Sequence, residues 1–180
     1  MGYQILSFLL EVAAGLLGGA CLLRMYMQHQ RVPFGNPIGR FVFALTNWVV
    51  LPLRRVLPSI GRWDTASLVA AYLVKLAQYG ILWALVGRTG YGFVFVSALF
   101  GLAQLALSAM TALVIVYAIL SWVQSDSLIA DVIDRLCAPL LRPFRRVIPL
   151  VGGIDLSPLV VLVLLQVASM VLQGVARGGF

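Results

Sequence analysis

The sequence has few charged residues for its length. Only 11% of its 180 residues are charged, whereas 62% are hydrophobic and the mean hydropathy is +1.01. A water-soluble domain of this size has about one-quarter charged residues. So few charges cannot cover a water-exposed surface, and the composition therefore excludes a soluble globular domain. It predicts an integral membrane protein of single-domain size.

The residue types that build disulfide, metal and catalytic sites are also scarce. The chain has two cysteines, Cys21 and Cys137, which lie far apart in sequence, and one histidine, His29. This pattern gives neither a disulfide framework nor a zinc cluster. The motifs of zinc proteases, serine hydrolases, P-loop NTPases and dinucleotide-binding domains are absent from the sequence. We therefore expect a protein that is not an enzyme and holds no metal or other cofactor.

Four charge-poor stretches are long enough to cross a bilayer, which takes about 20 apolar residues. We expect an all-α membrane protein with transmembrane helices near residues 5–23, 65–86, 96–123 and 157–175. The third stretch is longer than one span requires, so its start is the least defined boundary. The first stretch lacks the basic start and the small-residue cleavage site of a signal peptide, and we expect it to be retained.

Basic residues are concentrated in two segments of the chain. Thirteen basic residues against six acidic ones give a net charge of +7. Ten of the thirteen lie in residues 24–64 and 126–155. Because arginine-rich loops stay on the cytoplasmic side, we expect a multi-pass protein of the bacterial inner membrane with both termini in the periplasm. We expect the basic loops to contact anionic lipid head groups and not nucleic acid.

The two basic segments contain an internal repeat. The stretch PLRRVLP at residues 52–58 recurs as PFRRVIP at residues 143–149, and the same offset of 91 positions carries Asp64 onto Asp155. The sequence therefore predicts two units, residues 1–90 and 91–180, each made of a span, a basic loop and a span. Because each unit has two spans, the units form a parallel repeat with both arginine pairs on one side.

Each basic loop also contains a predicted amphipathic helix, short and polar enough to lie in the cytoplasmic membrane interface. The first helix has a start signal at Asn36-Pro37, and the second has one at Asp126 or Ser127. Apolar residues follow both signals at helical spacing. We expect proline to end both helices, at Pro52 in the first and at Pro139 and Pro143 in the second.

Two groups of polar residues flank the predicted spans. The arginine pairs, Arg54, Arg55, Arg145 and Arg146, are expected to bind lipid head groups, and a specific anion or partner site is the alternative. Asp64 and Asp155 open the second and fourth spans. There a carboxylate caps the helix, and it is also placed to pair with the neighbouring arginines.

A third group of polar residues lies within the spans: Glu11, Lys75, Gln104 and Gln166. Charged residues at this depth are costly and usually pair with one another or line a pathway. Two interpretations stay open for this group. The residues form structural hydrogen bonds between spans, or they line an ion pathway.

The second half of the chain carries a long and specific motif. Residues 119–122 (ILSW), 139–149 (PLLRPFRRVIP) and 152–158 (GGIDLSP) resemble the YggT family of small bacterial membrane proteins. The resemblance extends over nearly the whole chain, with one departure: Ser127-Leu128 stands where family members tend to have Asn-Pro. It implies a role in osmotic or extracytoplasmic stress and in ion homeostasis, and no enzymatic activity is established for the family. Plastid and cyanobacterial relatives are linked to haem attachment, but this chain has no histidine or cysteine pair placed to hold a haem.

We therefore expect a non-enzymatic inner-membrane protein that acts as a scaffold or assembly factor for other membrane proteins in stress tolerance. The alternative function is a small ion channel or transporter subunit that uses the polar residues within the spans. Association of identical chains is left open by the sequence.

Overall fold

A computed structural model describes residues 1–86, 92–123, 127–148 and 155–178. Within these residues the chain forms six helices and no strand, which confirms the all-α prediction. The helices are α1 (Gly2–His29), α2 (Pro37–Val56), α3 (Thr65–Val86), α4 (Gly92–Val123), α5 (Leu128–Arg145) and α6 (Ser157–Gly178).

The four expected spans are present as α1, α3, α4 and α6, each long and apolar enough to cross a membrane. The predicted second span has the same bounds as α3, whereas α1 and α6 extend a few residues beyond the predicted segments. The third span begins at Gly92, four residues before the predicted start. The helices are therefore those of a multi-pass membrane protein.

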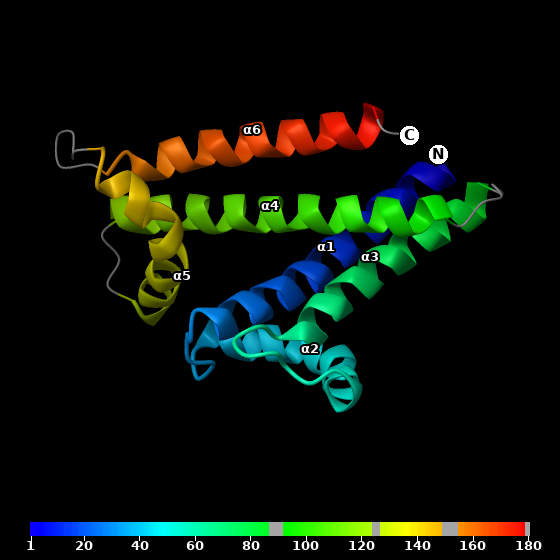
Figure 1. Ribbon diagram of the computed structural model, residues 1–180, viewed down its shortest axis with the longest axis horizontal. Coiled ribbons are helices and arrows are strands. Elements are labelled where there is room, and N and C mark those ends of the chain that lie inside the picture. Colours follow the sequence, from blue (N-terminus) through cyan, green and yellow to red (C-terminus); the bar gives the residue numbers. More distant parts are fainter. Residues whose placement is uncertain (87–91, 124–126, 149–154, 179–180) are drawn as a thin grey trace.

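The spans associate as two pairs. Helix α1 packs on α3, α4 packs on α6, and the pairs meet mainly where α3 contacts α4 (Figure 1). Helices α1 and α3 cross α4 obliquely, so the pairs diverge toward the end that carries α2 and α5, while both termini lie at the other end. A glycine permits the close contact of α3 with α4, because a Cβ at Gly101 would lie 2.6 Å from the Tyr79 ring.

Buried side chains form three apolar clusters. One joins α1, α2 and α3 around Cys21, Val50 and Ala70. Another joins α4, α5 and α6 around Val114 and Cys137. The third cluster links the two halves of the chain, because Met27 at the end of α1 and Val42 of α2 pack against Val132 and Leu136 of α5; its fifth buried member is Val32.

The starts of the two short helices follow the predicted signals. Pro37 is the first residue of α2, and the Asn36 side chain caps the helix by accepting a hydrogen bond of 2.8 Å from the Gly39 amide. At the start of α5 the Ser127 hydroxyl accepts a hydrogen bond of 3.1 Å from the Ala130 amide. Ser127 is thus the capping residue of α5, and Asp126 lies outside the described residues.

The expectation that proline ends these helices is wrong. Pro52 lies inside α2, and Pro139 and Pro143 lie inside α5, which ends at Arg145. All three prolines are on exposed faces of their helices. A proline removes one backbone hydrogen bond and bends a helix, but on an exposed face the freed carbonyl group can be hydrated. The helices therefore continue through these positions.

The tightest backbone contact at the start of α2 lies at Gly39. A Cβ at this position would lie 2.7 Å from the Phe34 Cα atom and closer still to its carbonyl oxygen. We expect Gly39→Ala to lower the free energy of unfolding by about 1–3 kcal/mol, because backbone atoms must shift to make room. Gly19→Ala in α1 is the matched control, since nothing lies within 4 Å of its Cβ position. The comparison is made by SDS titration in mixed micelles, and equal midpoints for the two variants would contradict the expectation.

Candidate functional site

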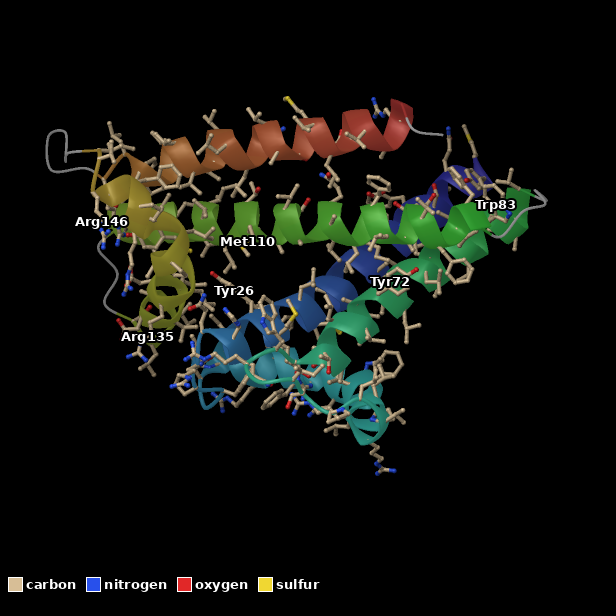
Figure 2. The ribbon with its side chains drawn as sticks, in the orientation of Figure 1. Tyr26, Tyr72, Trp83, Met110, Arg135 and Arg146 are labelled. Carbon is tan, nitrogen blue, oxygen red and sulfur yellow. The ribbon has the colours of Figure 1, made fainter. Side chains whose placement is uncertain are left out.

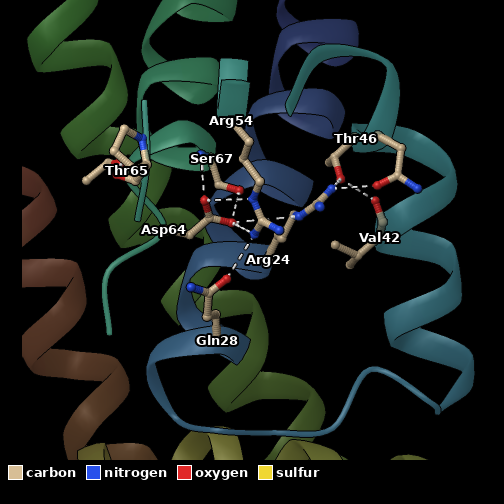
Figure 3. Close-up of polar contacts among 10 residues, drawn as sticks. Arg24, Gln28, Val42, Thr46, Arg54, Asp64, Thr65 and Ser67 are labelled. Carbon is tan, nitrogen blue, oxygen red and sulfur yellow. Dashed lines mark hydrogen bonds and ion pairs between the residues drawn. The ribbon is translucent and has the colours of Figure 1, made fainter. Parts of the chain in front are cut away.

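The Asp64 carboxylate, immediately before α3, lies at the centre of a buried polar network (Figure 3). Its Oδ2 atom accepts hydrogen bonds of 2.5 Å from Arg54 Nη2 and 2.6 Å from Ser67 Oγ. Its Oδ1 atom accepts the Ser67 backbone amide at 3.3 Å, so the same carboxylate also caps α3. Both roles expected from the sequence, helix capping and arginine pairing, are therefore filled by one side chain.

Arg24 of α1 adds a second cation to this network. Its side chain is only 2% exposed, and its Nε atom lies 3.8 Å from Asp64 Oδ2. Its Nη1 atom donates to Thr46 Oγ1 and to Asn47 Oδ1 of α2, both at 2.8 Å. The guanidinium also lies over the Phe43 ring, 4.6 Å from its centroid. The network thus joins α1, α2 and α3 through charge-assisted hydrogen bonds.

The protonation of Asp64 follows from these contacts. Burial alone would raise the pKa of this carboxyl group, but hydrogen bonds from Arg54 and Ser67 outweigh the loss of hydration and hold its pKa below 3.8. The carboxylate is therefore ionised at neutral pH. Removal of either the carboxylate or an arginine from a buried pair of this kind leaves an unpaired charge in the interior of the protein.

The second half of the chain has a similar network around a more exposed carboxylate. Arg145 Nε donates to Asp155 Oδ2 at 2.9 Å, and Asp155 Oδ1 accepts the Ser157 amide at 2.9 Å. Arg145 also donates to the Tyr117 hydroxyl. Burial would raise the pKa of Asp155, but hydrogen bonds from Ser157 and Arg145 lower it below 3.8. The two arginines are similarly exposed, 37% for Arg54 and 35% for Arg145, whereas the carboxylates differ, 0% for Asp64 and 17% for Asp155.

The four predicted arginines separate into two kinds. Arg54 and Arg145 are bound to aspartates, whereas Arg55 and Arg146 are exposed and form no ion pair with the described residues. Arg146 lies at the end of α5 (Figure 2). Binding of lipid head groups stays a prediction for Arg55 and Arg146. In Arg54 and Arg145 the contact with an aspartate competes with binding of a head group.

Of the predicted intramembrane polar residues, Glu11 and Lys75 lie near enough to interact electrostatically, but the four residues do not form one cluster. Lys75 is buried and its Nζ atom donates to Gln78 Oε1 at 2.9 Å, whereas Glu11 is exposed; these two described residues form no ion pair. Gln104 Nε2 donates to Ser169 Oγ at 2.6 Å, which joins α4 to α6. Gln166 is exposed on α6. The arrangement supports hydrogen bonding between spans for Gln104 and does not form a continuous polar pathway.

An apolar groove of about 470 Å³ lies between α1 and α4, with α2 at one end. Met110 of α4 and Tyr26 of α1 line it where the helices diverge (Figure 2). Gly15 and Gly19 of α1 also face it, and nothing lies within 4 Å of their Cβ positions. At the end near α5, the Tyr26 hydroxyl donates to the Leu136 carbonyl at 2.8 Å. The groove is thus open space between two membrane-spanning helices.

Arg24 is the main residue that the sequence does not assign to the site. The predicted first span ends at residue 23, which assigns Arg24 to the following loop. In the structure Arg24 lies inside α1, and its side chain is buried. The one available signal is the spacing of seven between Asn47 and Arg54, which places both on one face of α2. Nothing in the sequence connects that face with Arg24 before the helices are assembled.

Comparison with known proteins identifies the family of this chain. The model of the family described as CCB3/YggT matches residues 3–85 and matches again at residues 96–176. The protein named YggT of Escherichia coli K12 is 38% identical over 166 residues, which cover 92% of this chain and 87% of the relative. A Vibrio alginolyticus protein is 35% identical over 91% of both chains. Both relatives are named as uncharacterized, and no solved structure matches.

The two aspartates provide a matched test of the networks. We expect Asp64→Asn to lower the free energy of unfolding by about 3–5 kcal/mol, because it leaves buried guanidinium charge without its carboxylate. Asp155→Asn removes a pair that is partly hydrated, and we expect a loss of about 1 kcal/mol or less. SDS titration of both variants in mixed micelles measures the difference. Equal losses of unfolding free energy in the two variants would contradict the expectation, because they would show that burial of Asp64 does not increase its contribution to stability.

Proposed function

We propose that this chain, which belongs to the CCB3/YggT family, is a non-enzymatic scaffold or assembly factor for other membrane proteins of the bacterial inner membrane. The observation that carries the proposal is the open apolar groove between α1 and α4. Its walls are membrane-spanning helices, so its occupant must be apolar and must enter from the bilayer. A contribution to osmotic and extracytoplasmic stress tolerance is the expectation that family resemblance adds.

The groove fits a transmembrane helix of a client protein. Gly15 and Gly19 on α1 and Ala109 and Ala112 on α4 line it with small side chains. Small residues allow helix backbones to approach closely in a bilayer, where packing replaces the hydrophobic effect as the driving force for association. We infer that a client helix lies along these residues.

The proposed orientation places α2 and α5 in the cytoplasmic interface. Both helices bury one face, and their neighbouring basic segments hold most of the arginines. Arg55 and Arg146 are exposed there, and each contributes about 1 kcal/mol when it lies near anionic head groups. In this arrangement two units of the same orientation stand side by side, with both termini in the periplasm.

Ion transport is the less favoured function. A pathway through the protein needs polar side chains that follow one another across the membrane. Here Lys75 and Gln104 are each bound to a neighbour, while Glu11 and Gln166 are on exposed faces of different helices. This placement supports structural roles for the bound residues and gives transport little support.

Filling the groove tests the scaffold proposal. Gly19→Leu places a side chain in open space inside the groove, so we expect it to fold normally but to lose co-purification of membrane partners. We also expect it to fail to restore growth at high osmolarity in a strain lacking its own family member. Gly80→Leu on α3 is the control, because its Cβ position is equally open and lies outside the groove.

Two results would contradict the scaffold proposal. One is equal partner capture and equal growth for Gly19→Leu and Gly80→Leu. The other is a flux of potassium, sodium or protons through the purified protein in liposomes that Lys75→Met abolishes. The second result would establish the transport alternative in its place.

A further inference from the structure

Helix α6 exposes a regular row of side chains beside its contact with α4, since one member of the row, Gln173, bonds the same Ser169 hydroxyl as Gln104 of α4. The row has alternating spacings of four and three residues: Leu159, Val163, Gln166, Met170 and Gln173, all of them exposed. We call this row the α6 seam. Such spacing is that of a helix packing in parallel against another helix of similar sequence.

The two glutamines make this seam unusual for a surface that faces lipid. Gln166 lies near the middle of α6, at least about 13 Å from either helix end at 1.5 Å per residue. Its amide is exposed and makes no hydrogen bond to any residue in the described part of the chain. The membrane interior offers no water, and an unpaired amide there is costly.

Three other polar side chains of the spans donate hydrogen bonds within the chain. Gln104 is bound to Ser169, and Gln173 donates to the same Ser169 hydroxyl at 3.3 Å. Lys75 is the residue of the first half that corresponds to Gln166 in the 91-residue repeat. It is buried, and it donates a hydrogen bond to Gln78. Gln166 therefore stands out as an exposed amide at mid-span that needs a partner from outside this chain.

We propose that the α6 seam binds the α6 seam of a second copy of this chain, in a parallel pair related by a two-fold axis along the membrane normal. Copies inserted in one orientation place the same residue at the same depth, so Gln166 meets Gln166 of the second copy. A carboxamide both donates and accepts hydrogen bonds, so two identical side chains satisfy each other.

The chemistry of the seam favours an identical partner over a different one. The seam carries no charge from Leu159 to Gln173, so it does not require a partner of opposite charge. Its amides are self-complementary, and polar side chains of this kind join helices in membranes. The groove is lined by α1, α2 and α4, so dimer formation leaves it free for a client and does not depend on the proposed function.

Cysteine cross-linking tests the geometry with adjacent residues. Met170, in the seam, and Val171, outside it, are both 61% exposed and lie at nearly the same depth, about 100° apart around the helix. We expect oxidation in liposomes to give a disulfide-linked dimer for Met170→Cys and not for Val171→Cys. The native Cys21 and Cys137 are buried, and the unmodified chain measures any background from them. Equal cross-linking at both positions, or none at Met170→Cys, would overturn the proposal.

Removal of the amide tests the chemistry. We expect Gln166→Leu to weaken dimer formation by roughly 3- to 30-fold, from the range measured for hydrogen bonds between membrane helices. Val171→Leu should leave dimer formation unchanged. Single-molecule photobleaching in liposomes over a range of dilutions measures both. A monomeric wild-type protein, an unchanged Gln166→Leu dimer, or cross-links in native membranes only to a different protein would each reject the second copy as the occupant.

Discussion

The buried carboxylate of Asp64 is the constraint on which the first half of this protein depends. Its side chain is 0% exposed, hydrogen bonds from Arg54 and Ser67 hold its pKa below the usual range despite burial, and Arg24 lies 3.8 Å away. Those arginines come from α2 and α1, and Asp64 itself caps α3. One carboxylate therefore fixes the relative positions of three helices. A membrane offers little hydrophobic drive for such association, so paired polar groups make a larger relative contribution there.

The second half repeats this chemistry in a form that water can reach. Arg145 and Asp155 occupy the positions of Arg54 and Asp64, but the 91-residue offset carries Arg24 onto Ile115, which is 43% exposed. The second network therefore has no counterpart of the buried arginine.

Elements governed by local composition could be predicted from the sequence. The four spans followed from charge-poor runs, and the start of α2 followed from Asn36-Pro37. The repeated arginine pairs and aspartates indicated that each aspartate pairs with a neighbouring arginine, and the structure shows that the partners are Arg54 and Arg145. Features that depend on helix assembly could not be predicted. Whether Pro52 ends a helix depends on the helix face that it occupies. The role of Arg24 depends on the packing of α1 against α2, and the groove arises from the angle between the two helix pairs.

The central claim is that the Arg54–Asp64 contact holds α2 against the spans, and a double-mutant cycle measures this most directly. Unfolding free energies in mixed micelles are compared for the wild type, Arg54→Met, Asp64→Asn and the double variant. The account predicts that the double variant loses less stability than the two single losses together, with a coupling above the roughly 1 kcal/mol of an exposed ion pair. Additive losses would contradict it, because they would show that the two side chains contribute independently.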